Sequence, residues 1–346
     1  MGIHVRNYGE GKWQEFRPII LMASILLLLP LAAPSQMMAA EILIMAIPTL
    51  SFILLLGYVG QLHFGMGSLF AVGAYTTAIL MTKSHVPIIP AILAAVVFTG
   101  IISAIVGYFC NKQGGMIFAL LTLAFNQLIW FIIWQWKSFT GGADGIVGID
   151  RSTLELGLFS INLRPIFNFY VFVFIFLMLT FVIMQRLIKS PFGKVLQTLR
   201  ESELRAKAIG YDPMIYKWTA FIISGMFCGL GGALFALHQE YVGEHLAHWA
   251  TGTQIAIMAL LGGSFVMYGG VIGAGVFIFL SDWLNKFAFL SQTGGSLLIL
   301  GIVFVLVVMF FEAGLFGGAE SLYIKLKEKF AASSLKRANS ESRPEL

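Results

Sequence analysis

The stretch from 42 to 82 reads ILIMAIPTLSFILLLGYVGQLHFGMGSLFAVGAYTTAILMT and contains no Asp, Glu, Lys or Arg. These 41 residues are enough for two helices, because one crossing of a bilayer core takes about 20 apolar residues. A second uncharged stretch of 37 residues runs from 245 to 281. We expect each stretch to form two membrane-spanning helices.

Six more uncharged stretches are each long enough for one crossing. They are 18–40, 84–111, 113–136, 165–185, 218–239 and 287–311. The sequence therefore predicts an all-α, polytopic membrane protein with about ten transmembrane helices, since continuous apolar runs lack the alternation of a membrane β-barrel. The composition agrees: only 11% of residues are charged, against about 25% in soluble globular proteins.

The distribution of Lys and Arg predicts the orientation. Counting from a cytoplasmic N-terminus through ten crossings, 17 of the 22 Lys and Arg residues fall in inside segments. Those segments are 1–17, the turn at Lys112, the loop 186–217, and the residues from 312 onward. Because cytoplasmic loops carry an excess of basic residues, we expect both termini in the cytoplasm.

We divide the chain into a cytoplasmic N-terminal segment 1–17, a transmembrane domain 18–313 and a cytoplasmic tail 314–346. The alternative for 1–33 is a cleaved secretory signal, which would leave nine spans. The apolar run from Pro18 to Ala33 continues into seven further uncharged residues, which favours an uncleaved first helix.

The spans divide at the loop 186–217 into two sets of four with opposite predicted topology. In each set the second span is interrupted by glycines, at 60–67 (GQLHFGMG) and at 260–263 (LLGG). Such interruptions at matching places point to a transport pathway near the bilayer midplane, and close helix packing explains them equally well. The candidate pathway residues are Gln61, His63, Gly65, Gly262 and Gly263.

No catalytic constellation is evident, so we expect neither enzyme activity nor a bound cofactor. Gly193-Lys194 is followed by Val195, so the chain has no P-loop for ATP. Acidic residues lie at span ends rather than within spans, which argues against an ion-driven carrier. His63 is better explained as a hydrogen-bonded packing residue than as a proton carrier.

The basic loop 186–217 contains the signals of a short helix. Ser190 can cap its start with Pro191 in the first turn, and Gly210 can end it, so we expect a helix over 191–209.

Two pairs spaced i,i+4 would stabilise that helix, Glu201 with Arg205 and Glu203 with Lys207. Small residues at Ser202, Ala206 and Ala208 would form a patch on it. A solvated linker and a docking surface for a soluble partner both fit this composition.

The longest predicted external loop, 137–167, contains the sequence TGGADG. Its residues Gly141, Gly142, Asp144 and Gly145 are typical of turns, and a contact with solute or partner is the second interpretation.

Other polar features exclude further classes. Cys110 and Cys228 fall within or at the ends of spans, so they build neither a disulfide framework nor a metal cluster. The isoelectric point near 9.1 reflects basic inner loops rather than a surface for nucleic acid.

Four motifs, in order between about 41 and 318, resemble those of the LivM-type permeases of branched-chain amino acid ABC transporters. They are GYVGQ at 57–61 with Gly65 and Gly73-Ala74-Tyr75; TGGADGI at 140–146; RESE at 200–203 with Ala206, Ala208-Ile209-Gly210 and Tyr216-Lys217; and LGG at 261–263 with Gly269 to Gly273.

The resemblance implies one permease half of a bacterial inner-membrane importer, embedded in lipid. Its partners would be a LivH-type permease subunit, two ABC ATPases of the LivG/LivF type that hydrolyse ATP, and an extracytoplasmic solute-binding protein. The helix inserted into the ATPase would carry Arg200, Glu201, Ser202, Glu203, Arg205, Ala206 and Gly210.

The chain departs from the family at two positions. The family often has Ser at the position of His63 and His at that of Met66, so the solute can differ from a plain aliphatic amino acid. Related permeases carry urea or short amides, and selectivity in these systems resides largely in the binding protein. A self-sufficient channel or ion-coupled carrier is the alternative from a different class.

Overall fold

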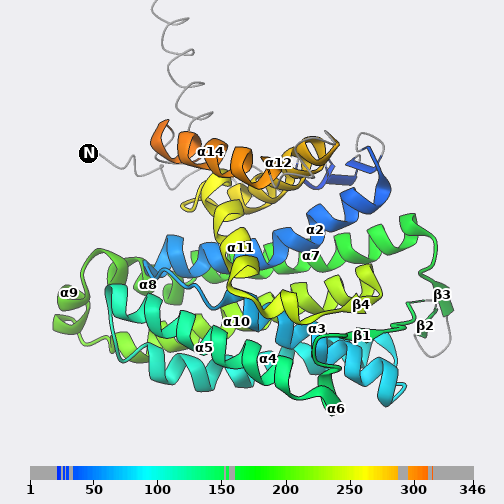
Figure 1. Ribbon diagram of the computed structural model, residues 1–346. Helices are drawn as coiled ribbons and strands as arrows, with labels where there is room; N and C mark the ends of the chain where they lie inside the picture. Colours follow the sequence, from blue (N-terminus) through cyan, green and yellow to red (C-terminus); the bar gives the residue numbers. More distant parts are fainter. Residues whose placement is uncertain are drawn as a thin grey trace, which may run out of the picture.

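The computed structural model describes residues 22–24, 26–27, 29–30, 34–151, 153–155, 160–286, 295–310 and 314. Within these ranges the chain is mostly helical, as Figure 1 shows. The long helices are α2 (Gln36–Ile53), α3 (Met66–Lys83), α4 (Ile88–Cys110), α5 (Gly115–Gln135), α7 (Ile166–Lys189), α10 (Pro213–Gln239), α11 (Trp249–Gly262), α12 (Met267–Asn285) and α14 (Gly295–Phe310). A π-helical turn, η1 (Leu54–Val59), continues α2.

Six helices in the described ranges are long and apolar enough to cross a membrane: α2 with η1, α4, α5, α7, α10 and α12. The chain is therefore a helical, multi-pass membrane protein. Each predicted uncharged stretch from 42 onward overlaps a helix, and the two longest overlap two long helices each. Of these, α3 and α11 are not among the six helices above, so two crossings in each long stretch stay a prediction. The total of ten spans stays a prediction, because the first span, 18–40, is only partly described. The segments 1–17 and 315–346 lie outside the described residues.

Both long uncharged stretches break at glycines in the left-handed region of backbone conformation. Gly60, with φ of +80°, ends η1, and residues 60–65 then run without helical structure to the start of α3. Gly263, with φ of +112°, ends α11 four residues before α12 begins. An L side chain is strained at such φ values, whereas glycine adopts them readily. We call 60–65 the first break and 263–266 the second break.

Glycines bring α3 and α10 into backbone contact at the centre of the bundle. A Cβ on Gly73 would lie 2.1 Å from the Gly229 carbonyl oxygen, and one on Gly232 would lie 1.9 Å from the Phe70 carbonyl oxygen. Small residues at these points let the two backbones approach, as in other membrane helix pairs.

Several helix contacts recur when α2, α3 and α4 are exchanged for α10, α11 and α12. Helix α2 packs against α12 as α10 packs against α4, and α3 packs against α4 as α11 packs against α12. The exchanged helices themselves are also in contact, as the pairs α2–α10 and α3–α11. An inverted repeat would produce such a recurrence, and the opposite topology of the two halves stays a prediction.

Short elements lie at the two ends of the bundle (Figure 1). One end carries α8 (Pro191–Glu201) and α9 (Glu203–Ala208), and we call it the α8 end. The other carries α6 (Lys137–Thr140), η2 (Glu244–Ala247) and two antiparallel strand pairs, and we call it the β end. Strand β1 (Ile146–Val147) pairs with β4 (Tyr241–Val242), and β2 (Thr153–Glu155) with β3 (Ser160–Asn162).

The predicted helix over 191–209 is wrong in one respect, because Ser202 divides it into α8 and α9. Ser202 has extended backbone angles, and its hydroxyl accepts a hydrogen bond from the Arg205 amide at 3.3 Å. Serine competes for backbone donors in this way, which makes it a better helix cap than an interior residue. The predicted cap at Ser190 is present, with Pro191 in the first turn.

Candidate functional site

The first break places Gln61 against the turn between α4 and α5. Its amide nitrogen donates a hydrogen bond of 2.8 Å to Asn111, whose own amide donates to the Gly107 carbonyl oxygen. Gln61 is buried, so this contact fixes the start of the break to the α8 end of α4.

His63 lies deeper in the same break, with its side chain 1% exposed. Its ring packs edge-on against Phe221 of α10, at 4.7 Å between centroids, and against Phe118 of α5 at 6.2 Å. Neither ring nitrogen has a hydrogen-bond partner among the described residues. The expectation of a packing residue is therefore met, but the expected hydrogen bond is not found. Gly65 lies against this ring, since its Cβ would be 3.1 Å from Cε1 of His63.

The glycines at the second break pack helices together. A Cβ on Gly262 would lie 1.7 Å from the Gly269 carbonyl oxygen, and one on Gly273 would lie 1.8 Å from that of Met258. Gly263 lies beside Gly314, the last described residue. The packing interpretation therefore accounts for Gly262 and Gly263, which do not line the groove described next.

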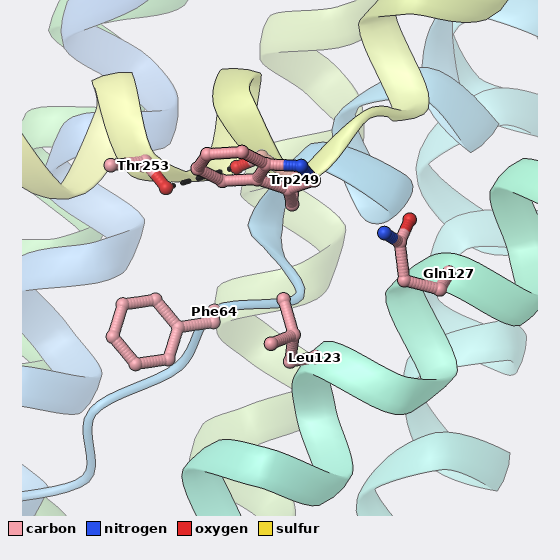
Figure 2. Close-up of a pocket in the computed structure, with 5 residues that line it drawn as sticks. All are labelled: Phe64, Leu123, Gln127, Trp249 and Thr253. Carbon is pink, nitrogen blue, oxygen red and sulfur yellow. Dashed lines mark hydrogen bonds between the residues drawn. The ribbon is translucent and has the colours of Figure 1, made fainter.

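A groove of about 330 Å³ opens where the first break meets the middle of α5 and the start of α11 (Figure 2). Its lining residues are Phe64, Leu123, Gln127, Trp249 and Thr253. Of the predicted pathway segment 60–67, only Phe64 faces it, so the sequence reasoning missed this set. A weak signal was present: Gln127 and Thr253 are polar residues within otherwise apolar stretches.

At the α8 end η1 meets the second break, and α8 contacts both. A Cβ on Gly57 of η1 would lie 1.9 Å from the Ser264 carbonyl oxygen of the second break. The guanidinium of Arg200 donates a hydrogen bond to the Gly57 carbonyl oxygen. The same group lies over the Phe265 ring, 4.4 Å from its centroid. One side chain of α8 thus touches the backbone of η1 and the second break.

The remaining residues of the predicted docking helix hold α9 in place. Glu201 and Arg205 form the predicted pair at 3.7 Å. Glu203 does not pair with Lys207 as predicted; it forms an ion pair with Lys217 of α10. Gly210 has the predicted left-handed conformation, with φ of +91°, which turns the chain from α9 toward α10.

The predicted patch of small residues is also wrong at Ala206. This side chain is buried against Val195 and Leu199 of α8, because α9 folds back on α8. The exposed surface of this segment is instead apolar and large: Leu204 is 81% exposed and Ile209 is 66% exposed.

The predicted external loop forms the tight turn expected of its glycines. Gly141, Gly142 and Gly145 all have positive φ, and a Cβ on Gly141 would lie 2.0 Å from the Gly145 carbonyl oxygen. Asp144 is exposed at the tip of this turn. A contact with solute or partner stays a prediction.

An ion pair that sequence reasoning missed fixes the rest of this loop to α10. The Arg151 side chain bonds to Glu240 at 2.9 Å and donates to the His238 carbonyl oxygen at 3.3 Å. Arg151 is buried, so this contact anchors the β end of the bundle.

Two helical stretches interrupted at glycines, with a groove beside the first break, are typical of a multi-pass protein of the transporter type. The chain belongs to the family described as "Branched-chain amino acid transport system / permease component", which matches residues 36–308.

Individual relatives agree with this family. The chain is 26% identical over 282 residues to the high-affinity branched-chain amino acid transport system permease protein LivM of Salmonella typhimurium. It is 25% identical over 279 residues to the Escherichia coli protein of the same name. Each match covers 75% of this chain but only 64% of the relative, so the chain spans less than two thirds of their length.

A relative with a different subunit name also matches. The probable branched-chain amino acid transport permease protein LivH of Methanocaldococcus jannaschii is 27% identical over 263 residues, covering 71% of this chain and 78% of the relative. No solved structure matches the chain.

Proposed function

We propose that this chain is the transmembrane permease subunit of a binding-protein-dependent ABC importer, moving branched-chain or other hydrophobic amino acids into the cell. The family match and the relatives named LivM support the substrate class. The observation that carries the proposal is the contact of Arg200 with Gly57 and Phe265. It connects a segment at the end of the bundle to η1, which precedes the first break, and to the second break, as a permease driven by an external motor requires.

The energy would come from partners rather than from this chain. We infer two ATPase subunits of the LivG/LivF type docked on α8 and α9, where the exposed side chains of Leu204 and Ile209 offer an apolar contact. Closure of the ATPases on ATP would move α8, and Arg200 would pass that movement to the two breaks. The permease itself would bind no cofactor.

The remaining partners complete the path. A LivH-type subunit would form the other half of the pathway, and an extracytoplasmic solute-binding protein would deliver the amino acid at the β end. This orientation requires the α8 end to face the cytoplasm of a bacterial inner membrane, with both chain termini on that side, as the basic loop 186–217 favours.

Purification of the chain from native membranes in mild detergent, followed by mass spectrometry of what accompanies it, tests the proposal. We expect a P-loop ATPase and a second, similar permease. Recovery of this chain alone, as an oligomer that transports without ATP, would contradict the importer and favour a channel or carrier.

A further inference from the structure

The groove has a fixed frame behind its lining residues. Asn126 accepts a hydrogen bond from the Ser68 amide at 2.7 Å and donates one to the Ala247 carbonyl oxygen at 3.0 Å. Thr122 accepts one from the Phe64 amide at 3.3 Å. The middle of α5 is therefore bonded to the first break, to α3 and to the segment before α11.

Two glycines let α3 and α11 pack closely beside this part of α5. A Cβ on Gly67 would lie 3.0 Å from the Gly252 amide nitrogen, and one on Gly252 would lie 3.0 Å from the Phe64 carbonyl oxygen. The lining residues follow directly from this frame, because Leu123 and Gln127 are the chain neighbours of Thr122 and Asn126, and Thr253 that of Gly252. Their backbones are positioned before any ligand arrives, as binding sites require.

The lining combines an apolar wall with two uncharged polar groups. In Figure 2 the Trp249 ring lies across the groove from Leu123, with Phe64 and Gln127 on opposite sides. The Thr253 hydroxyl donates to the Trp249 carbonyl oxygen at 3.0 Å, so it is used within α11. Among the described residues, the Gln127 amide has no hydrogen-bond partner, and both its donor and its acceptor can face a ligand.

We propose that this groove is a selectivity subsite of the permease for the aliphatic side chain of an amino acid, an inference that rests on the proposed function. Leu123, Phe64 and Trp249 surround the side chain, and Gln127 bonds to the polar end. Its volume suits a small ligand, since pockets for small molecules begin near 300 Å³. No lining residue carries a charge, so the groove offers a charged side chain no ion-pair partner. The permease then selects its solute in addition to the binding protein.

The test uses the complete importer, reconstituted in proteoliposomes with its binding protein, and compares uptake of L-leucine, L-alanine and L-phenylalanine. Leu123→Trp fills the groove, so we expect leucine uptake to fall at least tenfold more than alanine uptake. Trp249→Ala enlarges it, so we expect the ratio of phenylalanine to leucine uptake to rise at least fivefold. Leu179→Trp is the matched control, because Leu179 is exposed on α7 and does not line the groove.

Each outcome decides a separate question. Unchanged uptake ratios in both groove variants, with normal leucine transport by the wild-type importer, would overturn the subsite and leave the proposed function standing. An equal loss of all three substrates in Leu123→Trp, with an unchanged ratio in Trp249→Ala, would also overturn it, as a purely structural effect. Failure of the wild-type importer to carry any amino acid, with uptake of urea or acetamide instead, would contradict the proposed function itself.

Discussion

Arg200 of α8 donates a hydrogen bond from its guanidinium to the carbonyl oxygen of Gly57 in η1. This carbonyl group lies in the last turn of a π-helix, where carbonyl groups lack an intrahelical hydrogen-bond donor. Gly60 makes room for it, since a Cβ there would lie 3.0 Å from Cγ of Arg200. The same guanidinium covers Phe265, so α8 contacts both interrupted helical stretches near their breaks.

In the proposed importer, removal of this side chain should uncouple ATP hydrolysis from transport. We expect Arg200→Ala to lower leucine uptake at least tenfold and to abolish the stimulation of ATP hydrolysis by the liganded binding protein, because α8 then moves without the breaks. Arg200→Lys should give leucine uptake between that of the wild type and that of Arg200→Ala. It keeps the positive charge but loses the planar group that stacks on Phe265. Uptake and ATP hydrolysis in proteoliposomes measure both effects. Lys194→Ala, exposed on the same helix, serves as the control, and normal coupling in Arg200→Ala would contradict the relay.

A second prediction concerns the ion pair between Glu203 and Lys217. The Lys217 side chain is 9% exposed and that of Glu203 is 48% exposed, so Glu203→Lys leaves a nearly buried ammonium group facing a like charge. We expect the α9 segment to lose about 1–2 kcal/mol of stability, between the values for surface and buried pairs, and uptake to be abolished.

Exchange of the two charges distinguishes loss of the ion pair between Glu203 and Lys217 from loss of a direct contact between Glu203 and the ATPase. If the ion pair matters, the double variant Glu203→Lys with Lys217→Glu restores uptake to at least half of wild type. Uptake that stays absent although the protein level is normal would show that Glu203 itself contacts the ATPase. Transport assays on membranes matched for permease content give the answer.

Features set by short-range chemistry were predicted well from the sequence. The absence of charge over 42–82 predicted two membrane-spanning helices. Helices α2 with η1 and α3 form there, and α2 with η1 is long and apolar enough to cross a membrane. The cap at Ser190 and the left-handed turn at Gly210 were also found, because each depends on neighbouring residues only.

Features that depend on which faces meet in space were not predicted. Leu123 and Trp249 lie 126 positions apart in ordinary apolar stretches, and nothing local marks them as neighbours across a groove. The pairing of Glu203 failed for a related reason. The i,i+4 rule favours Lys207, but the turn at Gly210 brings Lys217 of α10 closer, where burial strengthens the attraction.

A third prediction tests the backbone contact between α3 and α10. Gly73→Ala should destabilise the protein by about 1–3 kcal/mol, because the new methyl group would meet the Gly229 backbone and wedge the two helices apart. Gly275→Ala in α12 is the matched control: its Cβ would be no closer than 3.7 Å to its neighbours. Alanine suits a helix better than glycine, so this control should be neutral or slightly stabilising. The apparent thermal midpoint of the detergent-solubilised importer measures both, and equal midpoints would contradict the tight crossing.

The last prediction tests where the ATPases dock. Leu204 is 81% exposed on α9, and burial of a leucine side chain in an interface contributes about 1.5–3 kcal/mol. Leu204→Glu replaces that gain with the cost of desolvating a carboxylate, so we expect at least tenfold less ATPase to co-purify with the permease. Val147→Glu places the same charge at the β end, on a side chain 70% exposed, and should leave ATPase recovery unchanged. The opposite result, with ATPases lost only in Val147→Glu, would place the ATPases at the β end. It would also reverse the proposed orientation, because the ATPases and the binding protein of an importer lie on opposite sides of the membrane.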